Sequence, residues 1–166
     1  VMAAQLDYGY STPKGVAGGK YDIAFDEVIT RKNEEADGVL KYGMAAMVGT
    51  NAGSGVKVPA TGCTADKIEG IVLRAANTEQ DMGGHVVVKN NASVGIVRRG
   101  HVWGRIASDA VPAYGAKAYV VVTGEDAGTF THLDKQTGEG TPANVDIGAT
   151  FGNAKDDGIA VIEIRM

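Results

Sequence analysis

The stretch Ala116-Lys117-Ala118-Tyr119-Val120-Val121-Val122-Thr123 decides the fold class of this chain. Its β-branched and aromatic residues favour a strand, and the run of three valines is typical of a strand at the centre of a sheet. Short apolar segments of the same kind recur on both sides, separated by turn residues. The further predicted strands are residues 39–50 (interrupted near Gly43), 56–58, 68–75, 85–89, 94–97, 101–107, 129–133, 145–151 and 159–164.

The spacing of the turn signals predicts an all-β protein. They fall roughly every 8–12 residues, which is typical of a sandwich or a barrel, and capped helical starts with long 3.6-residue periods are missing. Arg99-Gly100 is interpreted as one of these turns. Of the 166 residues, 24 are glycine, about twice the usual share, which fits many tight turns. We therefore predict a compact β-barrel or β-sandwich with an extended N-terminal arm.

The arm is predicted over residues 1–38, and the β domain over residues 39–166. The first part is polar and broken by glycine, and its residues 21–30 do not settle between a strand and one helical turn. Residues 31–38 form a charged joint that ends in the turn signal Asp37-Gly38. A segment that cannot bury its own core can become ordered against a neighbouring protein.

Composition excludes several functional classes. The net charge is −4, from 16 basic and 20 acidic residues, which disfavours non-specific binding to nucleic acid. No apolar run approaches the length of a membrane span, and the start of the chain lacks the features of a signal peptide. Cys63 is the single cysteine, so we expect no intrachain disulfide and assembly in a reducing cytoplasm.

No catalytic or metal-binding motif competes with a structural role. The histidines lack the spacing of metal ligands, and Cys63 has no base near it in the sequence. Glu34, Glu35 and Asp37 are carboxylates that acid–base chemistry uses, but Arg31 and Lys32 lie beside them, so salt bridges are the simpler interpretation. Asp156-Asp157-Gly158 is interpreted as an acidic turn before the last strand, not as a calcium loop. We expect no enzyme activity, no cofactor and no metal.

An ordered set of segments resembles a known family. The segments are Gly15-x-x-Gly18, Thr30-Arg31-Lys32-Asn33-Glu34-Glu35-Ala36, Lys41-Tyr42-Gly43-Met44-Ala45-Ala46-Met47-Val48-Gly49-Thr50, Gly70-Ile71-Val72-Leu73-Arg74, Val97-Arg98-Arg99-Gly100-His101-Val102-Trp103 and Gly158-Ile159-Ala160-Val161-Ile162-Glu163-Ile164. In this order and spacing, the chain resembles the structural cement proteins of tailed phages, also called capsid decoration proteins. The excursion over residues 124–144 has no match in this resemblance.

The resemblance implies a β-rich protein on the outer surface of the capsid in the virion. Such proteins bind the expanded lattice of the major capsid protein and bridge neighbouring capsomers, commonly as homotrimers, with no cofactor, nucleic acid or membrane. Contacts to the capsid or to a sister subunit are expected from the arm and the charged joint: Tyr8, Tyr10, Tyr21, Arg31, Lys32, Asn33 and Glu34. Deleting residues 1–35 is expected to leave a folded domain that no longer binds.

The alternative function is a carbohydrate-binding or adhesive β module displayed on the virion. Its cue is an exposed aromatic surface, for which the sequence offers Trp103 and a few tyrosines. Binding to a glycan array would favour this alternative.

Overall fold

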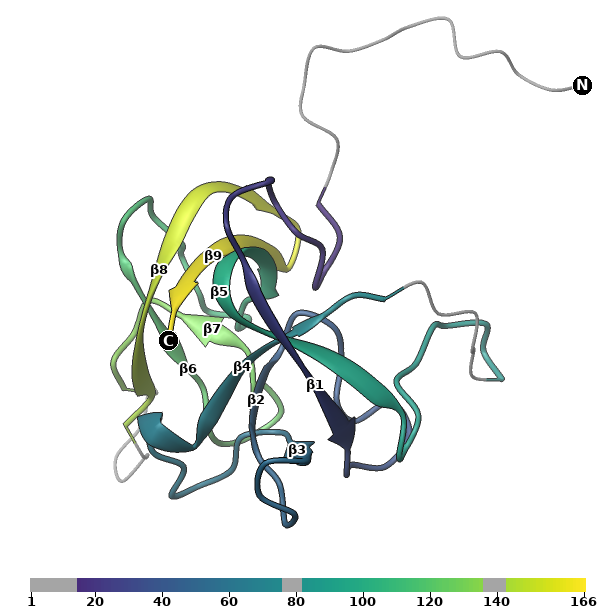
Figure 1. Ribbon diagram of the computed structural model, residues 1–166. Helices are drawn as coiled ribbons and strands as arrows, with labels where there is room; N and C mark the ends of the chain where they lie inside the picture. Colours follow the sequence, from purple (N-terminus) through teal and green to yellow (C-terminus); the bar gives the residue numbers. More distant parts are fainter. Residues whose placement is uncertain (1–14, 76–81, 136–142) are drawn as a thin grey trace, which may run out of the picture.

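The protein is all-β, as the sequence predicts. The computed structural model describes residues 15–75, 82–135 and 143–166 (Figure 1), and strands account for 45% of it. The strands are β1 (Glu27–Asn33), β2 (Ala45–Val48), β3 (Gly55–Lys57), β4 (Ile68–Leu73), β5 (Ser93–Arg105), β6 (Lys117–Val120), β7 (Phe130–Thr131), β8 (Val145–Asp156) and β9 (Ile159–Arg165), with a short 3₁₀ turn, η1 (Ala65–Lys67).

Five strands close into a barrel. Their order is β1-β3-β2-β4-β5, and β1 also pairs with β5, so each strand of this group has two neighbours. β1 runs parallel to β3 and antiparallel to β5. Closure removes the open strand edges that would otherwise invite pairing with other chains. Of the two predicted architectures, the structure therefore contains the barrel.

β5 also belongs to a second group of strands. Beyond it the sheet continues as β5-β9-β8-β6-β7, and a parallel bridge between Ile106 and Phe130 leads back to the end of β5. The Ala107 N–H donates to the Phe130 carbonyl across 2.9 Å at the same place. Figure 1 shows β5 passing behind β1 and curving up beside β9. This one strand thus joins the two halves of the molecule.

The prediction of a turn at Arg99-Gly100 is wrong. β5 continues through both residues, which stay paired with Arg165 and Ile164 of β9. Gly100 has φ of 135°, a backbone conformation that side-chain-bearing residues rarely adopt, so the strand bends there without ending. The predicted strand over residues 85–89 is absent too, because only Val86 makes an isolated bridge.

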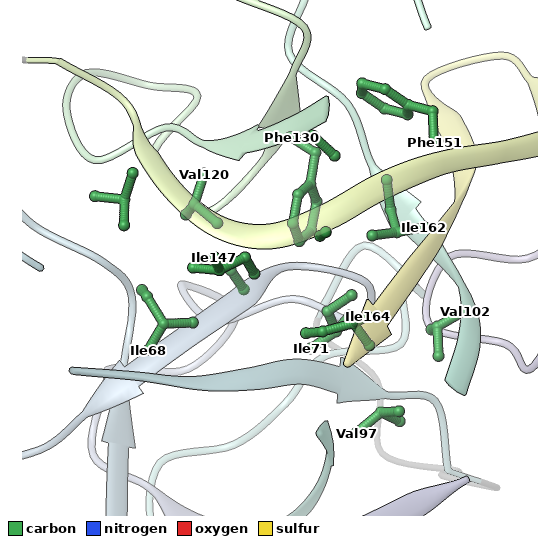
Figure 2. Close-up of a cluster of buried hydrophobic side chains, with 14 of the residues drawn as sticks. Ile68, Ile71, Val97, Val102, Val120, Phe130, Ile147, Phe151, Ile162 and Ile164 are labelled. Carbon is green, nitrogen blue, oxygen red and sulfur yellow. The ribbon is translucent and has the colours of Figure 1, made fainter. Parts of the chain in front are cut away.

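Alternating residues of β4 and β5 supply two separate cores. Val72 and Ile96 are register partners and pack in one cluster, with Leu40 and Val56. Ile71 and Val97 are the adjacent pair and face the opposite way, into the larger cluster. Figure 2 shows that larger cluster, in which Ile71 lies beside Ile164. Because both faces are buried here, consecutive residues of each strand are apolar, as in Ile71-Val72 and Ile96-Val97. Full burial of one such side chain contributes roughly 1.5–3 kcal/mol.

Part of the predicted arm belongs to the sheet. β1 lies inside the range 1–38, and its last residue, Asn33, has no exposed surface. Deleting residues 1–35 would remove a strand that closes the barrel, so a folded product is no longer expected from that deletion. An arm free of the sheet remains a prediction for residues 1–14, which lie outside the described residues.

Candidate functional site

Residues 15–21 are held against Trp103 of β5. Gly15 lies flat on the indole, and a Cβ built at Gly15 would come within 2.3 Å of that ring. The Gly18 N–H donates to the Trp103 carbonyl (2.7 Å), and the Trp103 N–H donates to the Gly19 carbonyl (2.9 Å). The rings of Tyr21 and Trp103 meet edge to face with their centroids 5.8 Å apart. Trp103 is therefore a buried anchor for the chain that precedes β1.

The next residues, 22–26, form an exposed loop beside the bend of β5. Ile23 and Phe25 are 104% and 76% exposed, although both are large and apolar. The Arg99 guanidinium carbon lies 5.7 Å from the centroid of the Phe25 ring. Between this loop and the ends of β5 and β9 lies a shallow cavity of about 420 Å³. Two large apolar side chains exposed on one loop beside a cavity make this surface a candidate interaction site.

A hydrogen bond and an ion pair hold this loop in place. His101 Nδ1 lies 2.5 Å from Asp22 Oδ2, and this hydrogen bond lowers the pKa of the Asp22 carboxyl. The Lys20 ammonium lies 2.5 Å from a carboxylate oxygen of Asp26. Ile23 and Phe25 are thus displayed from a loop whose polar residues are tied to the domain and to each other.

Along β1, the charged residues differ in what they offer a partner. Arg31 pairs with Glu69 of β4 across 3.2 Å, and both side chains are largely buried. Lys32, on the next position, is exposed. Asn33 is fully buried: its amide donates to the Lys89 carbonyl (3.0 Å), and its side-chain oxygen accepts from the Glu35 N–H (3.0 Å). Asn33 therefore ties the end of β1 to the segment before β5.

The acidic residues of the charged joint stabilise neighbouring loops. Glu34 accepts hydrogen bonds from the backbone N–H groups of Thr50 and Asn51, which lower the pKa of its carboxyl to about 2. The Glu35 carboxylate accepts from the Val58 N–H (3.2 Å), and that of Asp37 accepts from the Asn90 N–H (2.7 Å). The sequence interpretation expected salt bridges here, whereas backbone N–H groups are the main partners.

The expected contact residues therefore divide into groups. Tyr8 and Tyr10 lie outside the described residues. Tyr21 is half-buried, Arg31 is largely buried in its pair with Glu69, Lys32 is exposed, and Glu34 is bound within the chain. Because the Asn33 side chain is fully buried, we remove it from the proposed contact set. Ile23 and Phe25 are not among the contact residues expected from the sequence. They alternate with Asp22, Ala24 and Asp26, and such alternation indicates a segment with one apolar side.

The candidates for chemistry are dispersed. Within the described parts of the chain, no group of three or more His, Cys, Asp or Glu side chains is arranged so that it could hold a metal ion. Cys63 is buried, and this burial raises the pKa of its thiol, which opposes formation of a nucleophilic thiolate. Asp157-Gly158 is the turn of the β8–β9 hairpin, as predicted. None of the helical segments that the structure describes has the length and apolar character to cross a bilayer.

The fold is one found in phage capsids. A chain of the solved structure titled "The capsid of Myoviridae Phage XM1" superposes with a TM-score of 0.70 at 14% identity, covering 99% of this chain and 98% of the other. At this level of identity the likeness shows a shared fold. The comparison with curated proteins gives no match.

The sequence comparison is more specific. The family model described as "Structural cement protein (E217 gp24/Pam3 gp6)" matches residues 4–165. The chain belongs to this family of phage structural cement proteins. It is accordingly a structural protein associated with the phage virion, as the resemblance implied.

Proposed function

We propose that the protein binds the outer face of the expanded major-capsid lattice and bridges neighbouring capsomers, without enzymatic activity. The observation that carries the proposal is the exposure of two apolar side chains on a loop anchored to the domain. Ile23 is fully exposed, and Phe25 is mostly exposed. Burying such side chains in a partner gives roughly 1.5–3 kcal/mol each. Family membership supports the identity of that partner as the major capsid protein.

The anchoring limits what binding costs. A loop already held by the contacts of Tyr21, Asp22 and Asp26 loses less conformational entropy than a free segment when a partner covers it. Residues 1–14, with Tyr8 and Tyr10, precede this loop in the sequence and belong to the proposed contact set. Assembly as a homotrimer is part of the proposal, because several linked contacts on one lattice gain avidity.

A substitution in the loop tests this function. Purified wild-type protein is expected to co-sediment with expanded heads that lack it, whereas F25S and I23S/F25S are expected to bind at least about tenfold more weakly. Y114S is the matched control, since Tyr114 is 77% exposed, against 76% for Phe25, and lies outside the loop and its cavity. Equal binding by I23S/F25S and the wild type would contradict the loop as the contact surface.

A further inference from the structure

A second and larger cavity lies elsewhere on the molecule. Its volume is about 750 Å³, and it opens between residues 37–42, residues 85–89 and the ends of β4 and β5. Leu40, Val86 and Val88 give it an apolar lining, which continues into the core of the barrel. Arg74 and Arg105 line the same cavity. The site therefore combines an apolar wall with two guanidinium groups.

The two arginines share Tyr42 as their support. The Arg105 Nε–H donates to the Tyr42 carbonyl across 2.9 Å, and the Arg74 guanidinium carbon lies 5.8 Å from the centroid of the Tyr42 ring. Burial and, secondly, the charge of Arg74 lower the pKa of the Arg105 guanidinium. The charge of Arg74 thus disfavours the charged form of Arg105.

In the described structure, the carboxylates pair with groups other than Arg74 and Arg105. Over residues 15–75, 82–135 and 143–166, neither Arg74 nor Arg105 has a carboxylate within ion-pair distance. Asp37 also lines the cavity, but its carboxylate is bound by the Asn90 N–H (2.7 Å) and by Lys89 (3.4 Å). Arg31 provides the contrast, because it has Glu69 as an internal partner at 3.2 Å.

The backbone on both sides of the arginines is fixed. The Arg74 N–H donates to the Gly18 carbonyl, and the Arg105 N–H donates to the Gly43 carbonyl, each across 2.8 Å. Gly18 and Gly43 have φ of 77° and 81°, and a Cβ on either would come within 2.9 Å of neighbouring backbone. The backbone positions from which the two side chains extend are therefore set by the sheet before any ligand arrives, which favours binding.

We propose that this cavity receives a carboxylate from an acidic segment of a neighbouring protein chain, held by Arg74 and Arg105. The fork of donors on a guanidinium matches a carboxylate, and the apolar wall suits the residues that flank an aspartate or glutamate. A cavity of about 750 Å³ is much larger than one inorganic anion, which favours a peptide segment as the occupant. The inference deepens the proposed function and rests on it, since the segment is assigned to the capsid protein.

The test compares the affinity of four proteins for expanded, undecorated heads by co-sedimentation: wild type, R74Q, R74K and K155Q. R74Q is expected to bind about tenfold more weakly or worse, because a charge-assisted contact is lost. R74K, which keeps the charge without the fork, should recover part of the affinity. K155Q removes one exposed positive charge from β8, outside this cavity, and should bind like the wild type.

Thermal unfolding of the free proteins separates binding from folding. R74Q is expected to keep a Tm close to that of the wild type, because relief of the repulsion with Arg105 offsets the lost contact with the Tyr42 ring. Weak head binding with an unchanged Tm supports the site. A Tm that falls together with binding would mean that Arg74 acts through the fold, and this would overturn the inference.

The remaining outcomes identify the occupant. If inorganic phosphate alone raises the Tm of the wild type and not of R74Q, while R74Q binds heads normally, the site takes a free anion and the inference fails. If E79Q/D81N and R74Q lower the Tm equally, the carboxylate comes from the same chain, and the inference fails again; Glu79 and Asp81 lie outside the described residues. Wild-type protein that does not bind heads contradicts the proposed function itself. Wild-type binding matched by R74Q contradicts only this inference.

Discussion

Glu34, which follows β1, and Asn51, in the loop between β2 and β3, are joined by two hydrogen bonds. The Glu34 carboxylate accepts from the backbone N–H of Asn51 at 3.0 Å and from its side-chain amide at 3.1 Å. The adjacent Thr50 N–H donates to the other carboxylate oxygen across 2.6 Å. Glycine makes room for this carboxylate, since a Cβ at Gly55 would come within 1.9 Å of it. One acidic side chain thus fixes the loop that links two strands of the barrel.

This arrangement predicts a pH-dependent stability for E34Q. The Glu34 pKa is lowered to about 2 from its ordinary value of 4.5, so the ionised form stabilises the folded state above about pH 4.5. That contribution is lost as pH falls from 4.5 towards 2. E34Q should therefore be less stable than the wild type at pH 7, and the difference should shrink by pH 2.5. Urea unfolding at pH 7, 4 and 2.5 measures it.

The matched control for Glu34 is E125Q, which changes an exposed glutamate in the loop after β6. It should follow the wild type at each pH. A stability difference between E34Q and the wild type that stays constant from pH 7 to pH 2.5 would show that the hydrogen bonds of Glu34 do not depend on its charge.

Replacing Asn33 with alanine should be strongly destabilising. The N33A variant leaves the Lys89 carbonyl and the Glu35 N–H without the partners that Asn33 supplies in a fully buried position. Two such losses cost about 3 kcal/mol. The neighbouring K32A, at an exposed position of the same strand, should cost less than about 0.5 kcal/mol. Equal free energies of unfolding for the two variants would refute the structural role of Asn33.

The barrel should be sensitive to a methyl group at Gly70. A Cβ there would lie 2.2 Å from the Val97 carbonyl oxygen of the adjacent strand, whereas a Cβ at Gly53 has open space. Both glycines have positive φ, 145° and 81°, so alanine strains the backbone at both positions, and at Gly70 the clash adds to that strain. We expect G53A to cost about 1 kcal/mol and G70A more than about 3 kcal/mol. Chemical denaturation measures the free energies of unfolding of both variants. A G70A variant as stable as G53A would contradict the close approach of Gly70 to Val97.

Deleting residues 1–14 should separate binding from folding better than the longer deletion does. Every strand of the described structure lies beyond this segment, so the truncated protein should keep the Tm of the full chain. If Tyr8 and Tyr10 contact the capsid, its affinity for heads should fall about tenfold or more. Undiminished binding would remove both tyrosines from the contact set.

The central strands can be predicted from the sequence because their apolar residues are consecutive in the chain. Apolar runs such as Ile71-Val72 and Ile96-Val97 indicate a strand without any knowledge of the strands that pair with it. Both faces of these strands are buried, so consecutive residues are apolar instead of alternating with polar ones. β1 is different, since its one fully buried residue is the polar Asn33. Its place in the sheet depends on pairing with β5, which lies far along the chain. A hydrophobic pattern carries no information about such a contact.

The contact surface was predictable only in part. The sequence analysis pointed to the charged joint, residues 31–38, but its acidic members Glu34, Glu35 and Asp37 accept hydrogen bonds within the chain. Ile23 and Phe25 have the composition of core residues, and only their position in space shows that nothing in the described structure covers them. Arg74 follows β4 and Arg105 ends β5, so their shared cavity depends on the fold.

The central claim is that this protein decorates the expanded capsid at fixed positions. The most direct measurement is a binding titration of the purified wild-type chain against expanded, undecorated heads of its own phage, with bound copies counted by quantitative sedimentation. We expect saturable binding to expanded heads at a fixed number of copies per capsomer, and no saturable binding to unexpanded heads. A folded protein that does not bind expanded heads, or that binds without saturating, would contradict it.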